Sequence, residues 1–358
     1  MPQDSYKIIG LMSGTSIDGL DMCYTHFTKK NGIWSFQVIH AHTIEYPIEL
    51  VQRLQYATSL NAIDLYDLDQ ELGAYFSEEV VNFIAQFNIP QKEIDAISSH
   101  GHTIYHQPEK KITVQIGCGT TIAYKTGIPV INDFRKKDVI AGGQGAPLVP
   151  IGDDLLFGNE AVSFLNIGGF ANISFKKSNS VEAFDICPAN VLINWYMRKL
   201  GHSFDFNGNI ARSYPIHEQL LEELNSHSMY EQEKPKSLGI EWLERELIPI
   251  IEKYDCSIET KIATITEHSA FQIAQRLNQF DLKSVLITGG GAKNTHLITE
   301  ITKYYSGLIK IPSEEIIDFK EAIIFAFLGL LYLENEVNCL SSVTGAEQNV
   351  IGGVLHIP

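Results

Sequence analysis

The chain has 358 residues, of which 44% are hydrophobic and 20% charged, and its formal net charge is −16. This length suffices for two domains with substantial cores, and the apolar content argues against a disordered protein. The acidic balance argues against nucleic acid or an anionic membrane as a partner.

Segments for export or membrane insertion are not evident. No apolar run approaches the roughly 20 residues that cross a bilayer, and residues 1–7 lack the basic flank and apolar stretch of a signal peptide. The five cysteines are scattered without a C-x-x-C pair, and the twelve histidines show no H-E-x-x-H spacing. We therefore expect a cytoplasmic protein with reduced thiols and no zinc site.

Apolar patterning in the first half predicts an α/β lobe that opens with three strands. The predicted strands cover residues 6–12, 20–28, 34–43, 94–98, 112–116 and 129–132. The predicted helices cover residues 48–57, 62–87 and 120–126, and a glycine-rich loop covers residues 141–150.

The second half repeats this plan after a change in composition near Gly158. Strands are predicted at residues 161–167, 172–175, 181–185 and 284–288, and helices at 189–200, 241–253, 258–280, from 294, and at 319–333. Residues 314–318 are expected to be a polar linker. We expect an N-terminal lobe at 1–158 and a C-terminal lobe at 159–358, with the return of the C-terminal segment to the first lobe left open.

Three glycine-rich turns each follow an apolar strand directly, at residues 10–19, 166–169 and 288–291. Glycines allow backbone N–H groups to form an anion cradle, and hydroxyls such as Ser13 add donors. One such turn alone is more often an ordinary hairpin. Three at these separations resemble the actin, hexokinase and sugar-kinase architecture, in which two loops grip phosphates and a third packs near adenosine.

Other nucleotide-binding plans fit poorly. No G-x-x-x-x-G-K-[ST] string is present, and no H-R-D or D-F-G set appears. Gly117-Cys118-Gly119 begins like a dinucleotide fingerprint, but Ile122 occupies the third glycine position.

Longer strings resemble the anhydro-N-acetylmuramic acid kinase family over nearly the whole chain. The most specific are Met12-Ser13-Gly14-Thr15-Ser16-Ile17-Asp18-Gly19 and Ala141-Gly142-Gly143-Gln144-Gly145-Ala146-Pro147-Leu148-Val149-Pro150. Others are Ser99-His100-Gly101-His102-Thr103, Asp133-Phe134-Arg135, Leu165-Asn166-Ile167-Gly168-Gly169, Pro235-Lys236-Ser237, Gly289-Gly290-Gly291, Lys320-Glu321-Ala322 and Thr344-Gly345-Ala346.

This resemblance implies a two-lobed actin-like ATPase fold with the active site in the cleft between the lobes. It implies a kinase that opens the 1,6-anhydro ring of its sugar with water and moves the γ-phosphoryl of ATP to O6. The product would be N-acetylmuramic acid 6-phosphate, in peptidoglycan recycling. ATP and Mg²⁺ are the implied cofactors, and the family suggests a homodimer.

The resemblance also implies residue roles at the nucleotide. Asp18 would hold the ATP-bound Mg²⁺ through water. The residues placed at the nucleotide are Ser13, Gly14, Thr15, Ser16, Ile17, Asp18, Gly19, Leu20, Gly168, Gly169, Gly289, Gly290 and Gly291. Asp21 is equally well explained as a structural strand residue.

Asp185, near the end of a predicted strand, is the candidate general base for the attacking water. From the residues alone, an N-cap for the following helix is the competing interpretation. The segment departs from the family's F-D-T-G-P-G-N, because Ile186, Cys187 and Ala189 replace a threonine and two glycines. These residues add bulk beside the base and put the substrate in question more than the reaction.

Arg135 is the second candidate catalytic residue, since a guanidinium can bind sugar hydroxyls, a carboxylate or a phosphoryl group. An ion pair is its alternative role. His100, Gly101 and Glu321 are candidate substrate contacts, although Glu321 also suits an acid in a helix first turn. His102 stands where the family usually carries glutamine.

Two other functions are kept beside the leading one. The first is a kinase of the same fold for another anhydro- or amino sugar, prompted by the residues that follow Asp185. The second is a non-catalytic, nucleotide-dependent scaffold, since actin and chaperone relatives share the fold.

Overall fold

The computed structural model describes residues 4–14, 17–178, 180–231 and 238–358. The chain divides into two compact units: unit 1 comprises Met1–Phe157 and Phe319–Pro358, and unit 2 comprises Gly158–Asp318. The sequence suggested a boundary at 158 and left the place of the C-terminal segment open. In the structure that segment lies with unit 1.

Unit 1 is built on a six-stranded mixed sheet in the order β13-β7-β4-β1-β2-β3. Its strands are β1 (Ser5–Ser13), β2 (Gly19–Lys30), β3 (Ile33–Glu45), β4 (Ala96–Ser99), β7 (Val130–Asn132) and β13 (Val354–His356). β1, β4 and β7 run parallel, whereas β1, β2 and β3 form an antiparallel meander. A separate hairpin pairs β5 (His102–Gln107) with β6 (Ile112–Ile116).

The longest helix of unit 1 covers the sheet with one apolar face. Asn61 caps its start by accepting the N–H groups of Ile63 and Asp64, and Leu68, Leu72 and Phe76 are buried in the core. The helices of this unit are α1 (Ile48–Gln55), α2 (Ala62–Gln86), α3 (Gly119–Thr126), α4 (Lys136–Ile140), α5 (Val149–Phe157), α14 (Ser341–Thr344) and the part of α13 (Glu314–Leu333) from Phe319 on.

Helix α13 begins earlier than the sequence suggested, so the prediction of a polar linker at residues 314–318 is wrong. Glu314 and Glu315 form its first turn, where carboxylates interact favourably with the helix dipole. The Ser313 hydroxyl accepts the N–H of Ile316 at 3.4 Å, which adds an N-terminal cap. The linker prediction failed because it weighed polarity above these starting signals.

Unit 2 repeats the strand order of unit 1. Its five-stranded sheet has the order β10-β9-β8-β11-β12, with three antiparallel strands followed by two parallel ones. The strands are β8 (Ser163–Ile167), β9 (Phe170–Lys177), β10 (Ser180–Pro188), β11 (Ser284–Thr288) and β12 (Leu308–Lys310). The predicted α/β class, with the same plan in each half, is therefore confirmed.

The helices of unit 2 pack around α11, which is buried along most of its length. They are α6 (Asn190–Lys199), α7 (Asn209–Ser213), α8 (Glu218–Asn225), α9 (Ile240–Trp242), the π-helical η6 (Leu243–Leu247), α10 (Ile248–Glu252), α11 (Ile258–Gln279) and α12 (Thr295–Tyr304). Short 3₁₀ turns are η1 (Ala57–Ser59), η2 (Gln91–Glu93), η3 (Pro108–Lys110), η4 (Phe206–Gly208), η5 (Ser228–Glu231) and η7 (Gly290–Lys293). Within the described ranges, none of the helices is long and apolar enough to cross a membrane.

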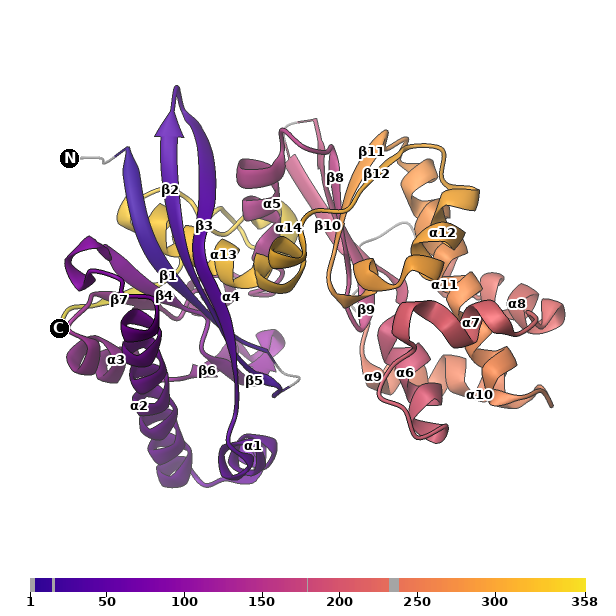
Figure 1. The fold of residues 1–358 in the computed structure, drawn as a ribbon, viewed down its shortest axis with the longest axis horizontal. Helices are drawn as coiled ribbons and strands as arrows, with labels where there is room; N and C mark the ends of the chain where they lie inside the picture. The colour runs from indigo at the N-terminus through magenta and orange to yellow at the C-terminus, as the bar shows by residue number, and fades with distance from the viewer. Residues whose placement is uncertain (1–3, 15–16, 179, 232–237) are drawn as a thin grey trace. The chain divides into compact units, whose positions relative to one another are not determined.

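Segments from the two halves of the sequence lie together in unit 1, where α13 packs against the first strands (Figure 1). Phe27 of β2 lies 5.5 Å from Phe327 of α13 between ring centroids. A Cβ at Gly10 of β1 would stand only 2.0 Å from the carbonyl oxygen of Ala322. The strand and the helix backbone therefore approach closely at Gly10, and only a residue without a side chain fits there.

We expect Gly10→Ala to destabilise the protein by about 1–3 kcal/mol, because the added methyl group forces strand and helix apart. Gly290→Ala is the matched control, since a Cβ there meets no atom within 4 Å. Chemical denaturation of both variants measures the difference. Equal stability of the two variants would contradict the close packing at Gly10.

Candidate functional site

Three strand ends bring the candidate residues of unit 1 to one edge of its sheet. β1 and β4 are parallel, with Leu11 opposite Ser99, and β4 and β7 are parallel, with Ser98 opposite Ile131. The N–H of His100 donates to the carbonyl oxygen of Leu11 at 2.9 Å. The carboxyl ends of parallel strands share an edge, which is where α/β proteins place ligands.

The first glycine loop joins β1 to β2 at this edge. Ser13 is buried, and its hydroxyl accepts from the Tyr46 hydroxyl at 2.6 Å and contacts His102 Nδ1 at 2.8 Å. Burial lowers the pKa of His102, which favours a neutral ring. Its Nδ1 then accepts a hydrogen bond from the Ser13 hydroxyl. The Ser13 side chain is thus held inside unit 1.

The remaining nucleotide candidates of this loop differ in their surroundings. Gly14 accepts the N–H of Ile17 at 3.2 Å, and Asp18 is exposed. A Cβ at Gly19 would lie 2.4 Å from the carbonyl oxygen of Ile44, and Leu20 is fully buried. Leu20 therefore presents no exposed surface in this structure. Thr15 and Ser16 lie outside the described residues.

Arg135 follows β7 and is held from two sides. Its Nε–H and Nη2–H donate to His100 Nε2 at 3.1 and 2.8 Å, and its Nη1–H donates to the carbonyl oxygen of Gly145 at 2.7 Å. The guanidinium carbon lies 6.0 Å from the ring centroid of Phe325. Burial lowers the guanidinium pKa from its usual value, and Glu321 opposes that shift.

Glu321 lies in α13 well beyond its first turn, so the alternative role as a first-turn acid is wrong. Its side chain has solvent-exposed surface, yet protein surrounds the carboxyl group closely enough for desolvation to raise its pKa. Lys320 and Arg135 oppose this rise. The neighbouring Lys320 forms a buried ion pair with Asp153 at 2.8 Å.

The glycine-rich segment 141–147 helps to hold the Arg135 side chain in place through the carbonyl oxygen of Gly145. The buried carboxylate of Asp138 accepts the N–H of Gly145 at 2.8 Å and the hydroxyl of Thr344 at 2.7 Å. A Cβ at Gly143 would stand 2.2 Å from Asp138 Oδ2. The family-like strings around Arg135, Gly145 and Thr344 are therefore parts of one hydrogen-bonded network.

In unit 2, the second and third glycine loops lie side by side. They follow the parallel strands β8 and β11, in which Asn166 stands opposite Thr288. A Cβ at Gly291 would come within 2.2 Å of the Ile167 side chain, so only glycine permits this approach. Gly290 is exposed, and a Cβ there would meet nothing within 4 Å. Gly290 therefore leaves open backbone that a ligand can contact.

The second loop also contacts the start of α6. The carbonyl oxygen of Gly169 accepts the N–H groups of Ala189 and Val191 at 2.9 and 3.0 Å, and that of Gly168 accepts the N–H of Asn190 at 3.3 Å. The segment after β10 is thereby fixed to the loop after β8. This contact places the Asp185 strand beside the glycine loops of unit 2.

Asp185 lies at an irregular point of β10. It pairs with Asn172, whereas Cys187 pairs with Ala171, so Ile186 is the extra residue of a β-bulge. Asp185 is half-buried, and its Oδ2 accepts the N–H of Leu238 at 2.8 Å. Burial raises its pKa above the usual 3.8, and the Leu238 hydrogen bond opposes that rise.

The alternative role of Asp185 as a helix N-cap is wrong, because α6 starts at Asn190 and its N-cap is Ala189. The side chains that depart from the family pattern are 1% exposed at Ile186 and 0% at Cys187 and Ala189. They belong to the hydrophobic core of unit 2. Their bulk is thus buried in the core, and does not line a solvent-facing surface.

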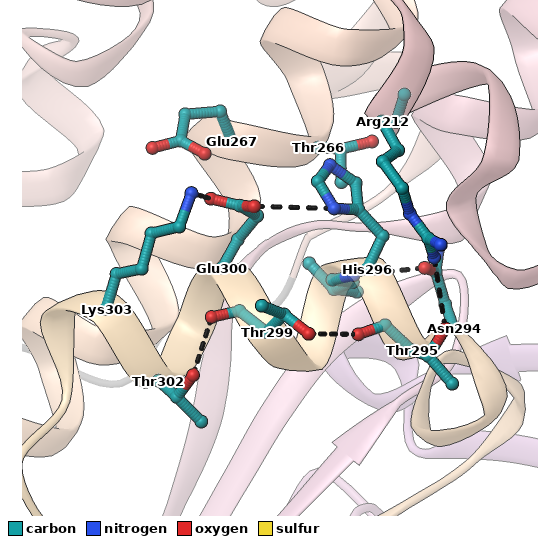
Figure 2. Close-up of polar contacts among 12 residues, drawn as sticks. Arg212, Thr266, Glu267, Asn294, Thr295, His296, Thr299, Glu300, Thr302 and Lys303 are labelled. Carbon is teal, nitrogen blue, oxygen red and sulfur yellow. Dashed lines mark hydrogen bonds and ion pairs between the residues drawn. The ribbon is translucent and has the colours of Figure 1, made fainter.

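Helix α12 continues directly from the third glycine loop and carries a cluster of charged side chains around the buried Glu300 (Figure 2). Asn294 caps the helix by accepting the N–H of Leu297 at 3.0 Å. Glu300 forms an ion pair with Lys303, and its carboxylate lies 3.3 Å from Nδ1 of His296, whose pKa is lowered by burial. Figure 2 shows Glu267 of α11 facing this group.

The cluster contains two neighbouring carboxyl groups whose pKa values are shifted in opposite directions. Burial raises the pKa of Glu267, and the adjacent Glu300 adds to the rise, although the Tyr304 hydroxyl donates to Glu267 and opposes it. Burial acts to raise the pKa of Glu300 as well, but Lys303, Glu267 and His296 together lower it. Glu267 is therefore the carboxyl that takes up a proton first as the pH falls.

We expect Glu267→Gln to raise the free energy of unfolding at pH 7, within the roughly 0.5–3 kcal/mol range of single substitutions. A carboxyl whose folded pKa is raised costs stability while it is ionised, and the amide mimics its neutral form. The gain should disappear as the pH falls through the unfolded-state pKa of glutamate. Denaturation between pH 4 and 8 measures this, with Glu259→Gln of the same helix as control. A gain that does not change with pH would contradict the assignment.

Several residues of the site were not found by sequence reasoning. Tyr46 carries no local signal, and the N–H of Leu238 is a backbone group that any residue supplies. Asp138 had one usable signal, since it is an acidic residue just before a glycine-rich segment. Its role depends on Thr344, which is far away in the sequence.

A family profile described as anhydro-N-acetylmuramic acid kinase matches residues 6–358. The chain belongs to the anhydro-N-acetylmuramic acid kinase family. A protein of that name from Shewanella oneidensis is 38% identical, with 96% of this chain and 97% of the relative covered. One from Coxiella burnetii is 34% identical, with 99% and 98% covered.

Solved structures show a more distant likeness. A ROK hexokinase from Thermus thermophilus aligns with 90% of this chain and 99% of its own, at 13% identity and a TM-score of 0.40.

Within the part of the chain that the structure describes, no group of three or more His, Cys, Asp or Glu residues could hold a metal ion.

Proposed function

We propose that this chain is an ATP-dependent kinase that opens 1,6-anhydro-N-acetylmuramic acid with water and phosphorylates its O6. The product is N-acetylmuramic acid 6-phosphate, and the role is peptidoglycan recycling. The observation that carries the proposal is Asp185, a half-buried carboxyl with a raised pKa beside two glycine loops, in a chain of this family. The group that accepts the phosphoryl group is an alcohol of the sugar, as in other sugar phosphotransferases.

Asp185 acts as the general base. It takes a proton from water while the water oxygen forms a bond to C1 of the sugar and the bond between C1 and O6 breaks. O6 then forms a bond to the γ-phosphorus of ATP, and ADP leaves. A raised pKa brings the base closer to neutral pH, where general-base catalysis is most efficient.

The glycine loops hold the nucleotide. Backbone N–H groups of open glycines such as Gly290 bind phosphate oxygens without a side chain in the way. An exposed carboxylate such as Asp18 fits Mg²⁺ that is held mainly by phosphates and waters, since kinase sites often supply only one or two carboxylates. Bound Mg²⁺ would neutralise phosphate charge. The proposed nucleotide residues are Ser13, Gly14, Thr15, Ser16, Ile17, Asp18, Gly19, Leu20, Gly168, Gly169, Gly289, Gly290 and Gly291.

Unit 1 supplies the sugar side of the site through Arg135, Gly101 and Glu321, with His100 beside them. Both ring nitrogens of His100 are already hydrogen-bonded, to Gly101 and to Arg135. We propose further that the enzyme works in the cytoplasm, where ATP is available, as a homodimer.

A kinase for a different anhydro- or amino sugar is the second candidate. It is motivated by Ile186, Cys187 and Ala189, but their burial in the core argues for an unchanged sugar surface. A nucleotide-dependent scaffold is disfavoured by the pKa shift and half-buried position of Asp185, which suit chemistry.

The test is turnover of ATP by the pure protein with 1,6-anhydro-N-acetylmuramic acid in ¹⁸O-water. Mass spectrometry should find a monophosphorylated sugar that has gained one ¹⁸O, and fragmentation should place the phosphate on O6. Unlabelled product incubated in the same water controls for exchange at C1. ADP release with another sugar only would support the second candidate, and no sugar-stimulated release would support a scaffold.

A further inference from the structure

Arg135 and His100 form an unusual pair, because the guanidinium donates to a neutral ring and not to a carboxylate. Arginine has only donors, so His100 Nε2, at 2.8 and 3.1 Å from Nη2 and Nε, must accept. His100 Nδ1 lies 2.9 Å from the carbonyl oxygen of Gly101, which fixes the proton on Nδ1. Both ring nitrogens are thus used within unit 1.

The surroundings of His100 keep its ring neutral and fixed. The side chain is 5% exposed, and its ring centroid lies 4.6 Å from that of Phe325. Burial lowers the His100 pKa well below its usual value, and the Arg135 charge adds to this effect. The ring therefore accepts from Arg135 without a charge of its own at any pH near neutrality.

This pairing has two consequences for Arg135. The described contacts use three of its five N–H groups, on Nε, Nη1 and Nη2, and leave one on each terminal nitrogen. A carboxylate in place of His100 would cancel the charge of the guanidinium, whereas a neutral acceptor leaves it for a ligand. Two terminal N–H donors with a full charge suit an oxyanion, either a carboxylate or a phosphoryl group.

We propose that His100 is a positioning residue that fixes the orientation of Arg135 and preserves its charge for an oxyanion of the reacting substrates. The inference rests on the proposed function in so far as Arg135 contacts those substrates. His100 itself contributes through Arg135, with no hydrogen bond of its own to the sugar. Gly145 completes the arrangement, because Asp138 holds its N–H and so fixes the carbonyl that Arg135 contacts.

Three substitutions at His100 separate the effect of its hydrogen-bond acceptor from the effect of its neutral charge. His100→Leu removes the acceptor, and we expect kcat/KM to fall about 10- to 100-fold, the loss typical of a hydrogen bond to a charged group. His100→Gln offers a neutral oxygen near the position of Nε2, and should recover most of that loss. His100→Glu offers an acceptor that also cancels the charge, and should lose about as much as His100→Leu.

Controls separate positioning from a general loss of structure. All three variants are compared for thermal unfolding and ADP binding, and His26→Leu, on β2 and bonded to Ser5, serves as the matched histidine control. The ¹⁵Nε–H signal of Arg135 should stay protected from exchange in His100→Gln and lose protection in His100→Leu. If the glutamine and glutamate variants have equal turnover, charge preservation is wrong. If the leucine variant matches the parent, the positioning role is wrong.

The source of the oxyanion is tested with 1,6-anhydro-N-acetylglucosamine, which lacks the lactyl carboxylate. If the carboxylate is the ligand, His100→Leu changes KM for the lactyl sugar and has no effect with the other sugar. If the transferred phosphoryl is the ligand, the loss appears in kcat with both sugars. An inactive parent protein would reject the proposed function, whereas an active parent with unaffected variants would reject only the role of His100.

Discussion

Replacing Asp185 with asparagine is expected to lower kcat by about 10²- to 10⁴-fold, the contribution typical of a general base. The amide has nearly the same shape but cannot take a proton from water. Its oxygen can still accept the N–H of Leu238, so the fold of β10 should be retained. Steady-state kinetics with saturating ATP and sugar measure the loss, and ADP titration should show unchanged affinity.

A control on the same strand keeps the result specific. Glu182→Gln changes a carboxylate of β10 that forms an ion pair with Lys177 at 3.1 Å, and should leave kcat within a few-fold of the parent. The pH profile adds a second criterion. The base works only when ionised, so kcat/KM should fall as the pH drops through its pKa, which burial raises above 3.8. Turnover of Asp185→Asn close to that of the parent would exclude the general-base role.

Replacing Arg135 with leucine is expected to lower kcat/KM by about 10²- to 10³-fold, comparable to the loss of one donor that stabilises transition-state charge. Arg135→Lys should recover little, because an ammonium group cannot reach His100, Gly145 and an oxyanion with fixed planar geometry. Kinetics with varied sugar measure both variants.

The neighbouring Lys136 provides the control for charge alone. It is exposed and lies 3.8 Å from Asp133, so Lys136→Met removes one positive charge without touching the Arg135 network. Its kcat/KM should stay within a few-fold of the parent value. If Lys136→Met and Arg135→Leu lose activity equally, a general electrostatic effect would replace the specific role of Arg135.

Local patterns predicted the regular elements well where one signal dominated. The strands at Ile112–Ile116 and Ser284–Thr288 have the bounds that the apolar runs indicated. Helix α2 follows the apolar face predicted from its 3.6-residue period. Helix α13 began earlier than predicted because capping and first-turn acids extend a helix into a polar stretch.

The candidate site likewise contains residues that local patterns predicted and contacts that they did not. The glycine loops and Asp185 were found because strand-loop patterns are local in the sequence. The hydrogen bonds of Asp185 with Leu238 and of Arg135 with His100 and Gly145 were not predicted, since they depend on strand pairing and on segments far apart in the chain. The bulk at Ile186 was expected beside the base, and the bulge and the core accommodate it.

The sequence by itself determined the α/β class, the family, the three glycine loops and the identity of the candidate base, because each depends on residues that lie close together in the chain. Tertiary structure decided the charge and orientation of the groups that would do chemistry. Desolvation raises the pKa of Asp185 and keeps His100 neutral, and desolvation depends on all the atoms that pack around a side chain. Such neighbours come from distant segments, so no local pattern can specify them.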